Sequence, residues 1–197
     1  MYARCGKRAL DLVGAALLLV ALSPVMAAVA AIVRVALGRP VIFRQVRAGR
    51  SGAPFAVLKF RTLREGPGDD AARMTRAGRV LRALALDELP QLLNVLRGEM
   101  SLVGPRPLPL NYVALYAPRQ ALRLAVRPGL AGLAQAAGRN AIGWSARLEL
   151  DARYAEAPPR LSRDLALLLR CAALAATGRG VAAPGHASMP PFRGERT

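Results

Sequence analysis

Residues 12–33 of this 197-residue chain read LVGAALLLVALSPVMAAVAAIV, a run of 22 residues without a charged side chain. A helix of about 20 such residues can cross the hydrocarbon core of a bilayer. Ser23 and Pro24 interrupt the run and leave 11 residues before the break and 9 after it. At about 1.5 Å per residue, each arm is about half as long as the core is thick. The stretch therefore predicts a membrane element made of two short helical arms.

Basic residues flank this run on both sides. Lys7 and Arg8 precede it, and Arg34 and Arg39 follow it. Because positively charged flanks are retained on the cytoplasmic side, both ends of the segment are expected on the same face of the membrane. A straight span cannot satisfy this, so we predict a re-entrant helix-break-helix anchor over residues 1–38 that enters and leaves the same leaflet.

The break at Pro24 leaves one backbone carbonyl group that needs a new hydrogen-bond donor. Pro24 has no N–H and therefore frees a carbonyl group one turn earlier in the helix. The hydroxyl of Ser23, neighbouring helices or water can satisfy it. Two other interpretations stay open: a kinked helix that spans the membrane once, and a signal peptide, since Ala28-Val29-Ala30 resembles a cleavage site.

The charge of the chain predicts an anionic partner. Lysine and arginine number 29 against 12 aspartate and glutamate, a formal net charge of +17, while 53% of the residues are apolar. Nucleic acid, an anionic membrane face and phosphorylated substrates are the usual partners of such a protein. Aromatic residues make up only 5% of the chain, and stacking on bases needs them. A basic nucleic-acid-binding protein is therefore the weaker alternative.

The scarcity of histidine and cysteine excludes several kinds of site. His186 is the only histidine, which argues against His-based triads, metal cages and acid–base relays. Cys5 and Cys171 have no motif spacing and are too few for a disulfide framework, which fits a reducing, cytosol-facing environment. Catalysis must therefore use carboxylates, arginines, lysines or the backbone.

The remainder of the chain predicts a mixed α/β domain over residues 39–177, rich in helix and with one short β-hairpin. The hairpin strands are expected at Pro40–Val46 and Pro54–Phe60, two β-branched or aromatic runs around a Gly/Ser turn. The other expected segments are a basic helix over residues 71–84, a core or interfacial helix over Leu165–Ala176, and a disordered tail over residues 178–197.

A further helix is predicted around residues 87–98. Asp87 is expected as its N-cap, Pro90 lies in its first turn, and Gly98 ends it. On this interpretation Asp87 and Glu88 only cap a helix, because the partial positive charge at a helix N-terminus favours carboxylates.

The same two carboxylates can also form a reactive site. Acidic residues are scarce, and the pair stands in sequence among the cations Lys59, Arg61, Arg79, Arg82 and Arg106. Guanidinium groups bind phosphate bidentately, so a fold that gathers these side chains makes a diphosphate site. Carboxylates and a diphosphate repel one another, which calls for a divalent cation such as Mg²⁺. A carboxylate can then attack phosphorus and form an acyl phosphate.

Eight motifs occur in order and carry a family resemblance. They are Lys7-Arg8-x-x-Asp11, the apolar stretch with Ser23-Pro24, Phe43-Arg44-Gln45, Lys59-Phe60-Arg61-Thr62, Leu86-Asp87-Glu88-Leu89-Pro90-Gln91, Ser101-Leu102-Val103-Gly104-Pro105-Arg106-Pro107, Arg127-Pro128-Gly129 and Gly138-Arg139-Asn140. Over about residues 2–177 the chain resembles the bacterial sugar transferases, which are small monotopic polyprenol-phosphate phosphoglycosyl transferases. It resembles the family's minimal catalytic unit. Two stretches, Ala136-Ala137 and Asp151-Ala152-Arg153-Tyr154, depart from the family pattern, which bears on donor choice if they touch the sugar or the nucleoside.

The resemblance implies a reaction and a place. A sugar 1-phosphate would pass from a UDP-sugar to a membrane polyprenol phosphate, such as undecaprenyl phosphate, with release of UMP. The reaction would take place among membrane lipids at the cytoplasmic face of the bacterial inner membrane. It would open the assembly of an exopolysaccharide or lipopolysaccharide and supply downstream glycosyltransferases, with no nucleic acid as a partner. A noncatalytic membrane scaffold of the same fold is the alternative.

The resemblance also implies roles for individual residues. Asp87 would be the nucleophile that forms a phosphoglycosyl-aspartate. Glu88 would assist through Mg²⁺ or by deprotonating the acceptor phosphate, and both carboxylates are candidate Mg²⁺ ligands. The candidates for phosphate contacts are Lys59, Arg61, Arg82, Arg106 and Arg139, with Arg106 favoured because prolines stiffen its loop. For Arg61 and Arg139 a scaffold salt bridge is an equal alternative.

Overall fold

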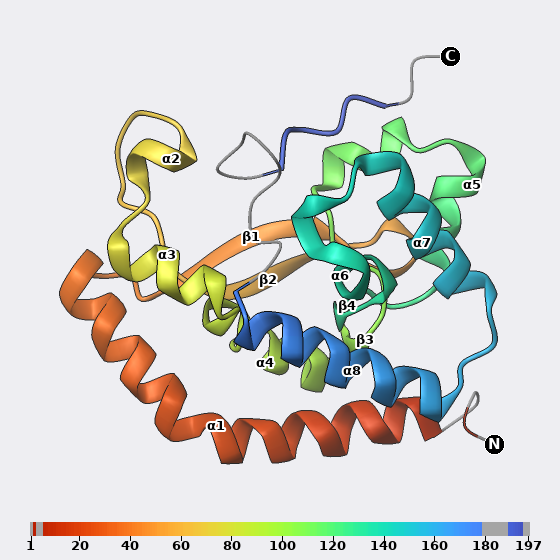
Figure 1. The fold of residues 1–197 in the computed structure, drawn as a ribbon, viewed down its shortest axis with the longest axis horizontal. Coiled ribbons are helices and arrows are strands. Elements are labelled where there is room, and N and C mark those ends of the chain that lie inside the picture. Colours follow the sequence, from red (N-terminus) through yellow and green to blue (C-terminus); the bar gives the residue numbers. More distant parts are fainter. Residues whose placement is uncertain (1, 3–5, 179–188, 195–197) are drawn as a thin grey trace.

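The computed structural model describes residue 2, residues 6–178 and residues 189–194 (Figure 1). Its helices are α1 (Lys7–Leu37), α2 (Asp70–Arg73), α3 (Arg76–Ala83), α4 (Gln91–Arg97), α5 (Pro118–Ala121), α6 (Leu133–Gly138), α7 (Trp144–Glu156) and α8 (Leu161–Ala176). Its strands are β1 (Ile42–Ala48), β2 (Pro54–Phe60), β3 (Ser101–Val103) and β4 (Gly129–Ala131). Short 3₁₀ turns are η2 (Arg50–Gly52), η3 (Leu86–Glu88), η4 (Leu110–Leu115), η5 (Leu122–Ala125) and η6 (Arg139–Ala141). Cys5 and His186 lie outside the described residues.

The predicted membrane segment is one helix that bends without breaking. Helix α1 runs for 31 residues through Pro24 and bends near its middle (Figure 1). Ser23 Oγ donates a hydrogen bond of 2.8 Å to the carbonyl of Val20, the group that an N–H at position 24 would otherwise have satisfied. Of the three predicted ways to satisfy this carbonyl, the Ser23 hydroxyl is the one observed.

Helix α1 is long and apolar enough to cross a membrane, and the protein covers little of it. Only 11% of its most apolar 18-residue stretch is buried inside the protein. The side chains of Leu17, Val20 and Val35 are more than half exposed. A core helix of a soluble protein buries such side chains, and large exposed apolar surfaces mark interaction sites. The exposure therefore indicates that α1 associates with a membrane.

Two apolar clusters attach the two arms of α1, residues 7–22 and residues 25–37, to the rest of the protein. Ala15 of the first arm lies in a cluster with residues of α4, β3 and α8. Val29 and Val33 of the second arm lie in another cluster with residues of β2 and α3. Leu86 and Leu89 of the segment that follows α3 pack against this second cluster. Because these leucines flank the two candidate carboxylates, the second arm of α1 helps to fix the site.

The structure contains the predicted hairpin and a second pair of strands. Strands β1 and β2 are antiparallel, with Ile42 opposite Phe60. Strands β3 and β4 form a parallel pair of three residues each, which sequence reasoning did not predict. Glycine makes this pairing possible, because a Cβ atom on Gly129 would lie 2.0 Å from the backbone nitrogen of Gly104. The pair anchors the loop that follows β3 and carries Arg106.

The basic helix expected over residues 71–84 is divided in two. Helix α2 ends at Arg73 and α3 begins at Arg76. Thr75 separates them, and its Oγ1 accepts a hydrogen bond of 2.9 Å from the N–H of Gly78. Threonine is a strong N-cap residue, so at this position the side chain starts a new helix and does not continue the old one.

The expectation that Asp87 caps a helix is wrong. Leu86–Glu88 form the turn η3, and α4 begins only at Gln91, with Pro90 in the N-cap position. A proline needs no N–H partner there. The predicted end of the helix at Gly98 is confirmed, and its φ of +85° is a conformation that favours glycine.

Helix α8 has a buried side and an exposed apolar side, so it serves in the core and also has an interfacial character. Leu167 is buried, whereas Leu161, Leu165 and Leu169 are exposed. Of the predicted tail, residues 189–194 are described and lie against the domain, with Phe192 buried. The predicted division into residues 1–38, 39–177 and 178–197 otherwise stays a prediction, and residues 179–188 and 195–197 lie outside the described part.

Candidate active site

Asp87 and Glu88 lie in η3, at the junction of α1, α3 and β2. Ala85, which precedes the turn, has a φ of +55°. This left-handed conformation is unfavourable for a residue other than glycine and persists only where the surroundings enforce it. Leu86 and Leu89 provide that enforcement through their packing against the second arm of α1. The two carboxylates are therefore held in place by tertiary packing on both sides.

Glu88 is held by two cations. Lys59 Nζ donates to Oε1 at 2.7 Å, and Arg106 donates through Nη1 to Oε2 at 3.0 Å and through Nη2 to Oε1. Burial alone would raise the pKa of Glu88, but the charges of Arg106 and Lys59 and their hydrogen bonds hold it well below its ordinary value. In return, the charge of Glu88 raises the pKa of Arg106. Glu88 is therefore ionised, and both of its oxygens are engaged.

The pKa of Asp87 is shifted in the opposite direction. Asp87 is only 6% exposed, and the described part of the chain offers its carboxylate neither a hydrogen bond nor an ion pair. Burial and the neighbouring charge of Glu88 raise the pKa of Asp87 to about 6, against the opposing charges of Lys59, Arg82 and Arg106. Adjacent carboxylates whose pKa values are pushed apart are typical of a site with divided roles. Asp87 has free oxygens for chemistry, and Glu88 organises the cations around it.

A buried ion pair positions the loop of Arg106. Arg123 Nη2 donates to the carbonyl of Arg106 at 2.5 Å and to Oδ2 of Asp151 at 2.8 Å. Arg123 and Asp151 are 3% and 1% exposed. Burial raises the pKa of Asp151, while the charge of Arg123 opposes the rise. Sequence reasoning did not identify Arg123, because nothing in its local pattern separates it from the other arginines.

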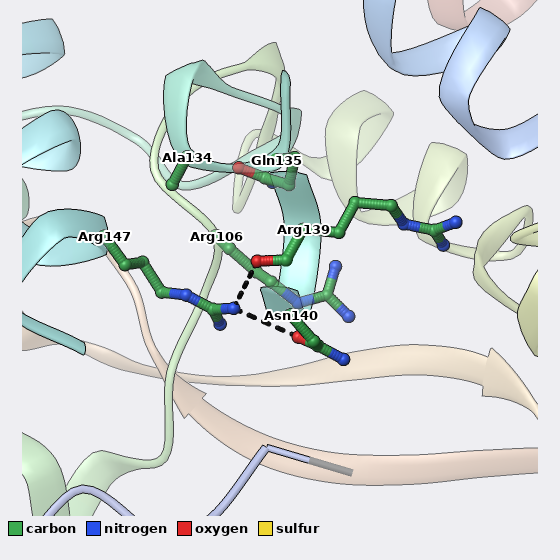
Figure 2. A pocket seen from close by; sticks show the side chains of 6 residues that line it. All are labelled: Arg106, Ala134, Gln135, Arg139, Asn140 and Arg147. Carbon is green, nitrogen blue, oxygen red and sulfur yellow. Dashed lines mark hydrogen bonds between the residues drawn. The ribbon is translucent and has the colours of Figure 1, made fainter. Parts of the chain in front are cut away.

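A pocket open to solvent lies beside the Arg106 loop. Figure 2 shows its lining residues, Arg106, Ala134, Gln135, Arg139, Asn140 and Arg147. Arg147, from α7, donates through Nη2 to the carbonyl of Arg139 at 2.6 Å and to Oδ1 of Asn140 at 3.1 Å. Burial and the charge of Arg106 lower the pKa of Arg147 to about 10.

The pocket has the electrostatics of an anion site. Three of its six lining residues carry a guanidinium group and none is acidic. Two buried polar atoms of the lining, Gln135 Oε1 and Arg147 Nε, have no hydrogen-bond partner among the described residues. Unpaired buried polar groups are costly, so the lining of the pocket is not optimised for stability alone. Sequence reasoning identified Arg139 and missed Arg147 and Gln135, whose only signal was their nearness to the Gly-Arg-Asn motif.

Four of the five predicted phosphate-binding residues lie around the two carboxylates or the pocket. Lys59 and Arg106 meet at Glu88, and Arg139 lines the pocket. Arg82 donates from Nε to Thr62 Oγ1 at 3.0 Å and lies 3.6 Å from Asp70, close enough for its charge to act on Asp87.

Arg61 belongs to the scaffold in this structure. Its Nη2 donates to the carbonyl of Leu37 at the end of α1, and its Nη1 pairs with Glu65 at 2.8 Å. Arg139 also has a scaffold contact, because its Nη1 donates to the carbonyl of Ala83 at 3.2 Å. The alternative of a structural role, left open for both residues, therefore has support from the geometry.

The carboxylates fit a divalent cation only in part. Among the described residues no group of three or more His, Cys, Asp or Glu side chains is placed to hold a metal ion. Mg²⁺ commonly binds through one or two carboxylates together with substrate phosphates and water. Asp87 meets that requirement, since its oxygens are free, whereas those of Glu88 already accept three hydrogen bonds. A metal ion at this site would need phosphate oxygens as further ligands.

Comparison with known proteins gives a consistent set of relatives. The model of a family described as bacterial sugar transferase matches residues 2–178. The uncharacterized sugar transferase EpsL of Bacillus subtilis is 49% identical over 76% of this chain and 77% of its own length. A UDP-glucose:undecaprenyl-phosphate glucose-1-phosphate transferase of Caulobacter vibrioides is 49% identical over 67% of this chain and 54% of its own length. The exopolysaccharide production protein ExoY of Sinorhizobium fredii is 39% identical over 76% of each chain.

Proposed function

The chain belongs to the bacterial sugar transferase family, and from this premise we propose that it transfers a sugar 1-phosphate from a UDP-sugar to a polyprenol phosphate and releases UMP. Relatives from Caulobacter vibrioides, Klebsiella pneumoniae and Aeromonas hydrophila are named as undecaprenyl-phosphate sugar phosphotransferases. The observation that carries the proposal is the state of Asp87, a buried carboxylate without a partner inside a cationic site.

The proposed reaction has two displacements at phosphorus. A carboxylate oxygen of Asp87 attacks the β-phosphorus of the donor, an acyl-phosphate bond forms, and the bond to the bridging oxygen breaks as UMP leaves with both electrons. A phosphate oxygen of the polyprenol phosphate then attacks the same phosphorus and releases the Asp87 carboxylate. Glu88 is a poor nucleophile in this arrangement, because Lys59 and Arg106 occupy both of its oxygens.

The cations would stabilise the charge that develops during these steps. Lys59 and Arg106, held by Glu88, and the guanidinium groups of Arg139 and Arg147 in the pocket are suited to contact the diphosphate. We include Mg²⁺ in the proposal, bound by Asp87 and the phosphates of the donor. Such an ion supplies positive charge that offsets the repulsion between the carboxylates and the diphosphate.

The membrane placement is part of the same proposal. The uncharged stretches of α1 on either side of Ser23-Pro24, residues 12–22 and 25–33, are each about half a bilayer core long. The helix bends between its arms (Figure 1), and basic residues flank both ends. We therefore propose a re-entrant anchor that holds the site at the cytoplasmic face of the inner membrane. An acceptor whose phosphate lies at the headgroup level meets a nucleophile at the same depth, which is catalysis by positioning.

Release of UMP tests the reaction. The purified protein is incubated with Mg²⁺, undecaprenyl phosphate and a panel of UDP-sugars, and we expect UMP from at least one donor. Asp87→Asn should abolish release, whereas Asp69→Asn, at the exposed N-cap of α2 where asparagine also caps well, should not. No UMP from any donor would favour a noncatalytic scaffold. Mass spectrometry of protein quenched with donor alone should find the phosphosugar on Asp87, and an adduct on another residue would overturn the mechanism.

Labelling tests the topology. In a chain with Cys171 replaced by serine, Cys5 and a cysteine introduced as Arg39→Cys lie on either side of α1. An impermeant thiol reagent applied from the cytoplasmic side of intact vesicles should modify both. Protection of one position but not of the other would show that α1 crosses the membrane once.

A further inference from the structure

The last described residues of the chain are packed, although they lie beyond the family match. The match ends at residue 178, and residues 189–194, which we call the strap, come after it. Phe192 of the strap is 5% exposed and lies in an apolar cluster with Leu108 and Leu148. Burial of a complete phenylalanine side chain removes a large apolar area from water. The strap is therefore a docked element and an addition to the family domain.

Three aromatic rings enclose Phe192. Its ring centroid lies 5.6 Å from that of Tyr112, 6.0 Å from that of Tyr116 and 5.5 Å from that of Trp144. These separations are in the range where aromatic pairs attract one another. Two hydrogen bonds fix the strap backbone: Phe192 N–H donates to the Tyr112 hydroxyl at 3.0 Å, and Trp144 Nε1–H donates to the carbonyl of Pro190 at 2.8 Å. We call these three rings the aromatic cage.

Arg147 contacts both the aromatic cage and the pocket. The guanidinium carbon of Arg147 lies 5.1 Å from the ring centroid of Trp144, a cation–π contact. Its Nη2 also lies 3.9 Å from the sulfur of Met189 in the strap. The same Nη2 holds the carbonyl of Arg139 and the amide oxygen of Asn140, two of the pocket residues drawn in Figure 2. The strap thus contacts a pocket-lining arginine directly and also supports it through Trp144.

A second chain of contacts connects the aromatic cage with Glu88. The Tyr116 hydroxyl accepts a hydrogen bond of 2.9 Å from Arg123 Nη1, and the Arg123 guanidinium carbon lies 5.5 Å from the Tyr116 ring centroid. Arg123 in turn donates to the carbonyl of Arg106, whose guanidinium group holds Glu88. Two cage residues therefore each support an arginine that acts on the site.

We propose that the strap completes the binding pocket for the nucleotide-sugar donor. Phe192 fixes Trp144 and Tyr116, and these rings hold Arg147 and the Arg106 loop where the diphosphate binds. The inference rests on the proposed function. It concerns the soluble donor and not the lipid acceptor, because the strap lies on the side of the molecule away from the apolar helix α1 (Figure 1). Phe192 acts through other side chains and is therefore a positioning residue.

Binding of UDP tests the inference without turnover. In the full-length protein, Phe192→Ala should weaken the affinity for UDP, measured by calorimetry, by about tenfold. Phe192→Leu, which keeps most of the apolar volume, should restore most of the affinity. Pro191→Ala changes an exposed neighbour in the same strap and should bind UDP as the wild type does. Trp144 is the only tryptophan, so its fluorescence should shift to longer wavelength in Phe192→Ala and report loss of docking.

Steady-state kinetics separate positioning from general loss of structure. Phe192→Ala should raise the KM for the UDP-sugar about tenfold and change kcat and the KM for the polyprenol phosphate by less than about twofold. An equal loss for both substrates, or a donor KM like that of the wild type, would overturn the strap inference while the wild-type enzyme remains active. A wild-type protein that releases no UMP from any donor would instead overturn the proposed function itself.

Discussion

Asp87 and Glu88 are neighbours in the sequence but their pKa values are shifted in opposite directions, because among the described residues only Glu88 forms direct ion pairs with cations. Lys59 and Arg106 take up the charge of Glu88, while Asp87 is buried against that charge with no partner of its own among the described residues. A buried, unpaired carboxylate is unfavourable for folding. Its presence in a cationic site indicates that this position serves function, since stability alone would not retain it.

The rate of donor cleavage should rise with pH through about 6. In the proposed mechanism Asp87 attacks only as the carboxylate, and its pKa is raised to about 6, so kcat/KM for the UDP-sugar should fall about tenfold per pH unit below that value. Initial rates of UMP release across the pH range measure this. Arg82→Gln should move the midpoint upward because it removes an opposing charge, whereas Arg79→Gln, on the exposed side of the same helix, should leave it in place. A profile that stays flat well below pH 6 would contradict the assignment.

The two carboxylates should also differ in their effect on stability. The folded-state pKa of Asp87 is raised from 3.8 to about 6, so its ionisation destabilises the fold increasingly as the pH rises through this interval. Asp87→Asn should therefore raise the free energy of unfolding near neutral pH by about 1–3 kcal/mol, a gain that disappears below about pH 4. Glu88→Gln should lower it by about 2–5 kcal/mol, because it leaves Lys59 and Arg106 without their partner. Thermal unfolding in detergent measures both, and equal signs would contradict the model of divided roles.

The short parallel pair of β3 and β4 is the element that places Arg106. Gly129→Ala should disrupt it, because the new Cβ atom would lie 2.0 Å from the nitrogen of Gly104 and backbone cannot move aside cheaply. We expect a loss of more than about 2 kcal/mol in stability together with most of the UMP-releasing activity. Gly143→Ala is the matched control, since a Cβ atom there meets nothing within 4 Å. Equal stability of the two variants would show that β3 and β4 tolerate separation.

Elements with a local signal could be predicted from the sequence. The bend of α1 follows from Ser23 and Pro24, and the hairpin follows from two β-branched runs around a turn. Strands β3 and β4 have three residues each and depend on the close contact between Gly104 and Gly129, which are far apart in the sequence. No local sequence pattern therefore predicts them. The residues of the site also divide into those with a local sequence signal and those without one. Lys59 and Arg106 stand in recognisable motifs, whereas Arg123 and Arg147 gain their roles only through tertiary burial.

At the scale of the whole molecule, α1 is a long, exposed apolar helix that also packs beside the candidate site. Its second arm packs beside the turn that carries the two carboxylates. Its first arm is attached by a buried polar cluster, in which Asp11 accepts hydrogen bonds of 2.9 Å from Ser101 Oγ and from the N–H of Leu102. Lys7 lies 3.3 Å from Asp11 and 3.3 Å from Asp164 of α8. This polar cluster therefore links the first arm of α1 to the domain that carries the site.

Asp11→Ala should loosen this link. The substitution leaves the N–H of Leu102 buried without its acceptor and removes one of the two acceptors of the Ser101 hydroxyl, the other being the carbonyl of Val103. This should lower the free energy of unfolding by about 2–4 kcal/mol, or the Tm by about 2–4 °C for each kcal/mol. UMP release should fall as well, because the first arm no longer holds α1 against the domain that positions the carboxylates. Leu17→Ala is the control on the same helix, since its side chain is 65% exposed and faces away from the protein; in detergent it should change neither quantity. If Asp11→Ala unfolded at the same temperature as Leu17→Ala and kept full activity, the first arm of α1 would not contribute to the site, and the packing of the second arm would suffice to hold it.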